Sequence, residues 1–116
     1  MKAKVVFHVD WDEEKRLVMA LNNMANLLKE VSVEDSEVCL VANGASVALF
    51  RRNPAPAHAS QMDDLSGKGV RFLVCGNSLR NFDISREDLL DPCEIVKAGI
   101  VELVRLQAEG FAYIKP

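Results

Sequence analysis

Short apolar runs alternate with longer amphipathic stretches along the whole chain. The apolar runs are rich in β-branched residues and are not interrupted by alternating polar positions, which is typical of strands buried on both faces of a parallel sheet. We expect five such strands, the last at a sheet edge because the chain then ends in a proline, which cannot donate to a further ladder. They are predicted at residues 4–9, 37–42, 70–74, 94–97 and 111–114.

The stretches between these runs have helical periodicity. The longest stripe predicts a helix that lasts to about Val31 and is capped by Asp10 or Asp12; its apolar positions are Leu17, Leu21, Met24, Ala25 and Leu28. Shorter helices are expected at residues 45–51 and 59–66. A capping-box pattern, Ser85-Arg-Glu-Asp88, opens another that ends near Leu90. The last helix begins at Gly99, with Ile100, Leu103, Val104 and Ala108 on one face.

This alternation of strands and helices predicts one α/β domain over residues 1–116. The expected architecture is a three-layer α/β/α sandwich around a mainly parallel five-stranded sheet, with flavodoxin-like or Rossmann-like topology. Ligands of such sheets bind outside the carboxyl ends of the strands. Polar side chains collect at the predicted carboxyl ends, so we expect the site there; these are His8, Asp10, Asn43, Cys75, Asn77 and Lys97.

Composition and charge exclude several functional classes. The formal net charge is −3 and no basic block occurs, which argues against nucleic acid or an anionic membrane as the partner. The first apolar run is too short for a signal peptide or a membrane span. Three cysteines without a C-x-x-C indicate neither a disulfide framework nor a zinc site, so we expect a cytoplasmic protein with reduced thiols.

Known cofactor motifs are also missing. The sequence contains neither G-x-G-x-x-G nor G-x-x-x-x-G-K-[ST], which excludes dinucleotide and P-loop sites. The acidic stretch Asp10-Trp-Asp-Glu-Glu14 after the first strand would repel the phosphate of a flavin nucleotide. The two histidines lie far apart in the sequence, so the sequence predicts neither a cofactor nor a metal ion.

Cys75 is the strongest candidate for chemistry. It comes where the third strand should end, and Gly76 and Asn77 are then expected to turn the chain. Asn77 or Ser78 would cap a short helix that carries Leu79. A sulfur between a strand end and a helix start lies in the field of unpaired amide N–H groups, which favour the thiolate. The alternative is a buried cysteine that acts as a small hydrophobic residue.

Two polar residues could assist Cys75. His8, near the end of the first strand, could hydrogen-bond to the thiolate or polarise it, or it could be structural. Asn43 could cap the helix after the second strand, or its amide could contact bound sulfur or an anion.

The remaining cysteines and histidine have simpler interpretations. Cys39 lies in the middle of the second strand and is expected to pack in the core. Cys93 follows a proline in a predicted loop, where it is either a resolving thiol or structural. His58 lies in a Pro/Ala-rich loop and is expected to be solvated.

Three stretches resemble the DsrE/DsrF-like proteins of intracellular sulfur oxidation and sulfur relay. They are Gly69-Val-Arg-Phe-Leu-Val-Cys75-Gly-Asn-Ser-Leu-Arg80, the turn Val41-Ala-Asn-Gly44, and the ending Leu106-Gln-Ala-Glu-Gly-Phe-Ala-Tyr-Ile-Lys-Pro116. The resemblance implies a three-layer α/β/α domain, usually assembled as a homotrimer or homohexamer. It also implies that the cysteine matching Cys75 carries sulfur as a persulfide and passes it to a partner.

The resulting hypothesis is a sulfur carrier. Cys75 would take sulfur from a donor protein and yield it to an acceptor thiol, and the amides after Gly76, from Asn77 and Ser78, would stabilise the anion. One alternative is a non-catalytic assembly or regulatory module in which Cys75 only packs. A second is a cysteine hydrolase, which would need a histidine such as His8 placed against the thiol.

Overall fold

The computed structural model describes all 116 residues and contains one five-stranded sheet with the order β4-β3-β2-β1-β5. Every pair of neighbouring strands is parallel. The strands are β1 (Ala3–Val9), β2 (Ser36–Ala42), β3 (Arg71–Cys75), β4 (Cys93–Val96) and β5 (Ala112–Ile114). The predicted five-stranded parallel α/β fold is therefore confirmed, with β5 at an edge as expected.

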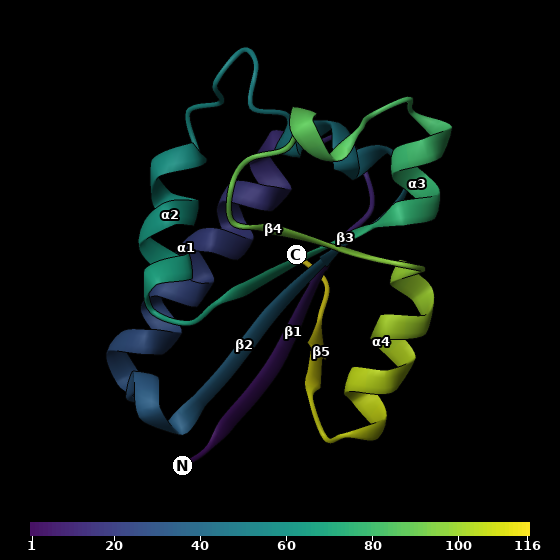
Figure 1. The fold of residues 1–116 in the computed structure, drawn as a ribbon. Coiled ribbons are helices and arrows are strands. Elements are labelled where there is room, and N and C mark those ends of the chain that lie inside the picture. The colour runs from purple at the N-terminus through teal and green to yellow at the C-terminus, as the bar shows by residue number, and fades with distance from the viewer.

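Helices cover both faces of this sheet (Figure 1). The α-helices are α1 (Glu14–Glu30), α2 (Ala59–Gly67), α3 (Gly76–Asn81) and α4 (Gly99–Ala108). Three 3₁₀ helices complete the chain, namely η1 (Val33–Asp35), η2 (Gly44–Phe50) and η3 (Arg86–Asp88). In Figure 1, α1 and α2 lie on one side of the strands and α4 lies on the other.

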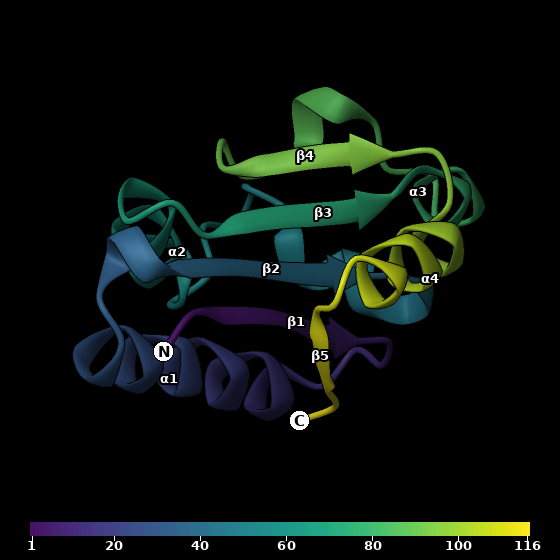
Figure 2. The same ribbon diagram turned by 90° about the horizontal axis from the view of Figure 1, so that it is seen from below.

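The order of the strands explains this division. From β1 to β4 the chain steps in one direction across the sheet, and it then returns to place β5 beside β1. Since crossovers between parallel strands are right-handed, a reversed step puts its helix on the opposite face. Figure 2 shows the strand arrowheads pointing toward the side where α3 and the beginning of α4 lie. The N-termini of α3 and α4 therefore border the carboxyl edge.

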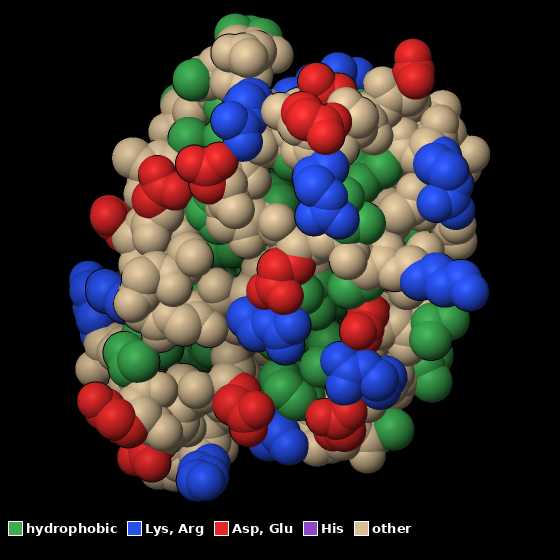
Figure 3. All heavy atoms as spheres, in the orientation of Figure 1, with side chains coloured by type: hydrophobic (Ala, Val, Ile, Leu, Met, Phe, Trp, Pro, Cys, Tyr) green, Lys and Arg blue, Asp and Glu red, His purple; other side chains and the backbone are tan.

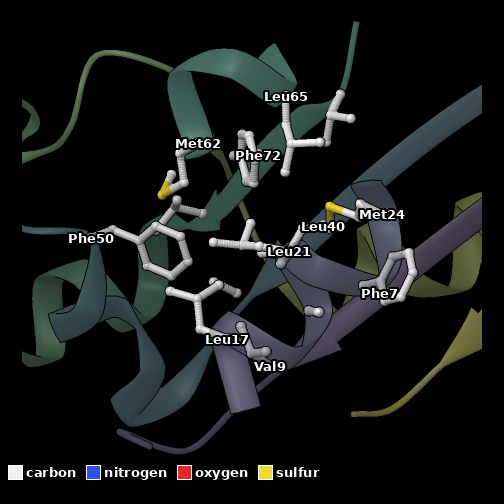
Figure 4. Close-up of a cluster of buried hydrophobic side chains, with 14 of the residues drawn as sticks. Phe7, Val9, Leu17, Leu21, Met24, Leu40, Phe50, Met62, Leu65 and Phe72 are labelled. Carbon is white, nitrogen blue, oxygen red and sulfur yellow. The ribbon is translucent and has the colours of Figure 1, made fainter. Parts of the chain in front are cut away.

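The larger core fills the space between the sheet and helices α1 and α2 (Figure 4). Phe50 and Phe72 are completely buried there, together with Leu17, Leu21, Met24, Leu40, Met62 and Val74. A smaller cluster lies under α4 and consists of Val6, Cys39, Val41, Leu73, Leu103, Leu106 and Phe111. Alternate residues of each strand thus face opposite layers, as the pleat requires.

One predicted helix cap is wrong, and one predicted helix is of the 3₁₀ type. Glu13 precedes α1 in the N-cap position without a side-chain capping bond, and Asp10 instead forms a 2.9 Å ion pair with Lys115. The helix expected at 45–51 is the 3₁₀ helix η2. The Ser46 N–H donates to the carbonyl of Asp10 (3.2 Å), so contacts to the end of β1 replace an α-helical first turn.

Two later helices also differ from expectation. The capping box of Ser85 and Asp88 is present, but it opens only the single turn of η3. On α4, Leu103 and Leu106 are buried, whereas Ile100 and Val104 are 62% exposed. Helix α4 packs alone against this face of the sheet. The sheet covers only part of the apolar side of the helix, and the rest stays exposed.

The face drawn in Figure 3 has no block of one charge. Lysine, arginine, aspartate and glutamate side chains are interspersed over the face drawn in Figure 3. No helix of the structure combines the length and the apolar character needed to cross a bilayer.

Candidate functional site around Cys75

Cys75 is both the last residue of β3 and the N-cap of α3. Its Sγ accepts a hydrogen bond from the backbone N–H of Ser78 at 3.4 Å, so the thiol itself caps the helix. The prediction that Asn77 or Ser78 provides the cap is wrong, and Gly76 and Asn77 are helical rather than a turn. The reason is that β3 enters α3 directly, which leaves the first free amides facing Cys75.

A second helix, α4, begins close to Cys75. The first residue of α4 is Gly99, and a Cβ atom there would lie 3.2 Å from Cβ of Cys75 and 3.1 Å from Cβ of Asn43. Both separations are tighter than ordinary carbon contacts, so only glycine lets the helix start this close. Gly76 is similarly confined, because a Cβ atom there would lie 3.0 Å from the carbonyl oxygen of Val96.

These contacts change the acidity of the thiol. Burial by itself would raise the pKa of Cys75, but the Ser78 hydroxyl and the backbone N–H groups of Gly99, Ser78 and Asn77 together outweigh it. The pKa of Cys75 therefore lies below the ordinary thiol value. The N–H of Gly44 donates to Oγ of Ser78 at 2.8 Å, which leaves the hydroxyl proton free to point at the sulfur.

Cys75 is only 5% exposed, and a surface hollow is lined by its neighbours Asn77 and Val96 but not by Cys75 itself. In the register of β3 and β4, Cys75 is paired with Val96, which lines this hollow. The volume is about 430 Å³, and the lining residues are Asn77, Val96, Lys97, Ala98, Val101, Glu102 and Arg105.

His8 and Asn43 contact each other and not Cys75. Nε2 of His8 is 2.8 Å from Oδ1 of Asn43, and Nδ1 is 2.6 Å from the Tyr113 hydroxyl. Of the two interpretations of His8, the hydrogen bond to the thiolate is absent because β2 lies between β1 and β3, and the structural one holds. Asn43 occupies the N-cap position of η2, but its side chain makes no capping bond. Tyr113 was not predicted, since no local pattern pairs it with a residue 105 positions earlier.

The other two cysteines are unsuited to work with Cys75. Cys93 is the first residue of β4 and pairs with Phe72, and it packs against the core of α1 and α2. Cys75 faces α4, so the two thiols lie on opposite faces of the sheet, and the resolving role for Cys93 is wrong. Burial raises the pKa of Cys93 to about 12. Cys39 packs in the smaller core as predicted, and burial raises its pKa too.

His58 is buried, which contradicts the expected solvated position. Its loop folds back over η2, and Nε2 is 2.8 Å from the carbonyl oxygen of Leu49. Nδ1 is 3.8 Å from a carboxylate oxygen of Glu14 at the start of α1.

The acidity of the thiols gives a first prediction. Iodoacetamide should modify Cys75 before Cys93, with a pH inflection below that of free cysteine, because only the thiolate reacts. Ser78→Ala should move that inflection to higher pH because it removes a donor to the sulfur. Peptide mass spectrometry over a pH series measures both effects, with Ser60→Ala on exposed α2 as the control. Faster labelling of Cys93 would contradict the assignment.

Comparison with known proteins places this geometry in context. The model of the DsrE/DsrF-like family matches residues 3–116. The structure of MTH1491 from Methanobacterium thermoautotrophicum, a protein of unknown function, is 35% identical, covers 99% of this chain and 100% of its own, and superposes with a TM-score of 0.90. The ychN protein of E. coli shares the fold at 18% identity with full coverage of both chains and a TM-score of 0.80.

A more distant structure has the same architecture. BT1422 from Bacteroides thetaiotaomicron is 14% identical, covers 97% of this chain and 94% of its own, and has a TM-score of 0.65. A search of curated proteins finds no significant match.

Proposed function

Because this chain belongs to the DsrE/DsrF-like family, we propose that it is a sulfur-relay protein in which Cys75 carries one sulfur atom as a persulfide. The observation that carries this proposal is the convergence of α3 and α4 on one sulfur. The N–H groups of Ser78 and Gly99 face that sulfur, and the pKa of Cys75 is lowered accordingly. Donors of this kind favour the thiolate, which is the reactive form of cysteine.

The reaction is an exchange between sulfur atoms. The Cys75 thiolate attacks the outer sulfur of a donor persulfide, R–S–SH, so that one S–S bond forms as the donor S–S bond breaks and R–S⁻ leaves. An acceptor thiolate then attacks the outer sulfur of Cys75–S–SH and releases the Cys75 thiolate. Since each step forms one S–S bond and breaks another, no external oxidant or reductant is required.

The surroundings suit the charge and size of the intermediate. The amide N–H groups of Asn77 and Ser78, at the start of α3, favour negative charge on the Cys75 sulfur. Gly76 keeps this helix start against the end of β4. The outer sulfur would extend toward the hollow that Asn77 and Val96 line, where the ammonium group of Lys97 makes no ion pair within the chain.

The partners follow from the same proposal. A donor and an acceptor of sulfur would dock at the carboxyl edge, and the chain itself would assemble as a homotrimer or homohexamer in the cytoplasm. The exposed apolar side chains of α4, Ile100, Val101 and Val104, are the candidates for that assembly.

The two alternative functions differ in how much support they have. An assembly or regulatory module is favoured by the exposed apolar stripe of α4 and by the low exposure of Cys75. The cysteine hydrolase gains no support, because His8 is engaged by Tyr113 and Asn43 and does not contact the thiol.

The proposal is tested by loading the reduced protein with inorganic polysulfide and measuring its intact mass. We expect the mass of one added sulfur atom, its release on addition of a thiol acceptor, and complete loss of the adduct in Cys75→Ser. Cys39→Ser and Cys93→Ser are matched controls that should retain it, since Cys39 is buried in the core and Cys93 lies half-buried on the other face of the sheet. An adduct that survives in Cys75→Ser, or none in the parent protein, would favour the assembly module.

A further inference from the structure

A chain of side-chain hydrogen bonds runs along the carboxyl edge of the sheet from β5 to the end of β2. The Tyr113 hydroxyl is 2.6 Å from Nδ1 of His8, and Nε2 of His8 is 2.8 Å from Oδ1 of Asn43. These residues come from β5, from β1 and from the loop after β2, which lie side by side in the sheet. These hydrogen bonds thus connect the edge strand β5 to Asn43, a residue that borders the Cys75 site.

The contacts define the tautomer of the histidine. Oδ1 of Asn43 can only accept a hydrogen bond, so Nε2 of His8 carries the proton. In the neutral ring Nδ1 then holds a lone pair and accepts from the Tyr113 hydroxyl. Tyr113 therefore favours the tautomer in which His8 donates to Asn43.

This arrangement fixes which end of the Asn43 amide is turned toward His8. Because the oxygen is held by His8, the NH₂ group points away from β1 and donates no hydrogen bond within the chain. Cβ of Asn43 and Cβ of Cys75 both lie against Gly99, which places Asn43 next to the thiol-bearing residue across one helix start. The two amide protons are thus free for a ligand, on a residue that packs against the same helix start as Cys75.

We propose that the Asn43 NH₂ group binds the negative charge of a reagent held at Cys75, with His8 and Tyr113 as positioning residues. This inference rests on the proposed function and names the residue that recognises the anionic outer sulfur. If the amide were reversed, its oxygen would face the anion and Nε2 of His8 would lose its acceptor, so the observed orientation favours anion binding.

The experiment compares two alkylating reagents of similar size, anionic iodoacetate and neutral iodoacetamide, on the full chain at one pH. Both react with the same thiolate, so the ratio of their rates at Cys75 cancels changes in thiolate population and reports anion recognition. Asn43→Asp should lower the iodoacetate-to-iodoacetamide ratio by about tenfold or more, because a carboxylate replaces the amide donor. His8→Phe and Tyr113→Phe should lower it by about threefold, since they release the amide.

Two variants distinguish positioning from simple packing. His8→Gln retains an N–H donor for Asn43 and should restore most of the ratio lost in His8→Phe. Asn26→Asp adds the same charge at an exposed position of α1, across the sheet from Cys75, and should leave the ratio unchanged. Thermal unfolding of each variant measures the structural cost separately. A lowered melting temperature with an unchanged ratio in Asn43→Asp and His8→Phe would overturn the proposal.

The outcomes also separate this inference from the proposed function. A ratio that responds as expected without any persulfide adduct would leave anion recognition standing and remove the sulfur relay. A persulfide that forms while the rate ratio is unchanged in Asn43→Asp would support the sulfur relay and remove anion recognition by Asn43. A Cys75 thiol that reacts with neither reagent would contradict both.

Discussion

Gly99→Val should raise the pKa of Cys75 and slow its alkylation at neutral pH by about tenfold or more. A β-carbon at this position would meet Cβ of Asn43 at 3.1 Å and Cβ of Cys75 at 3.2 Å, and the additional methyl groups of valine cannot be accommodated there. The start of α4 would have to move away from the site and take its N–H donor with it. Overpacking of this kind costs about 1–3 kcal/mol of unfolding free energy.

The effect is measured by the pH profile of iodoacetamide labelling together with thermal unfolding. Gly99→Ala is a milder version that keeps the test useful if the valine variant does not fold. Gly67→Val is the matched control, because a β-carbon at Gly67 would meet no atom within 4 Å. An unchanged Cys75 profile in Gly99→Ala and Gly99→Val would mean that the α4 amide does not activate the thiol.

The pH dependence of stability follows from the same donors. The folded pKa of Cys75 lies below its unfolded value, so the stabilising contribution is fully present above the unfolded pKa and is lost as the pH falls through the folded pKa. Cys93 behaves in the opposite way. Its folded pKa of about 12 exceeds the ordinary thiol value, so its contribution is lost as the pH rises toward 12.

Phe72→Ala should lower the free energy of unfolding by about 3–5 kcal/mol. Phe72 lies on β3, has no exposed surface, and packs in the middle of the larger core shown in Figure 4. Its removal would leave a cavity between the sheet and helices α1 and α2 that neighbouring strands cannot close. Because a small domain is stable by only about 5–15 kcal/mol, this is a large fraction of the total.

Urea unfolding gives the measurement, with the slope of the transition expected to stay constant. Phe82→Ala makes the same chemical change at a side chain that is 43% exposed, so its cost should stay below about 1 kcal/mol. Equal losses in the two variants would contradict the layered core described above.

Much of this architecture follows from local patterns in the sequence. The unbroken apolar runs identified all five strands to within two residues of their bounds, and the stripe ending near Val31 identified α1. Parallel strands place their carboxyl ends at one edge, so the position of Cys75 beside polar residues could be predicted without the strand order. The capping box at Ser85 was also local and is present.

Contacts between distant segments of the chain were decided only by the tertiary structure. The return of β5 to β1 brings Tyr113 to His8 across 105 residues, and the arrival of α4 at Cys75 depends on a single close approach at Gly99. The pleat places Cys93 on the opposite sheet face from Cys75, which a predicted loop could not indicate. Periodicity reports which side of an element is buried, whereas these contacts depend on which elements become neighbours. The sequence alone therefore determined the sheet and the edge where the thiol lies, and the packing of distant elements decided which groups surround it.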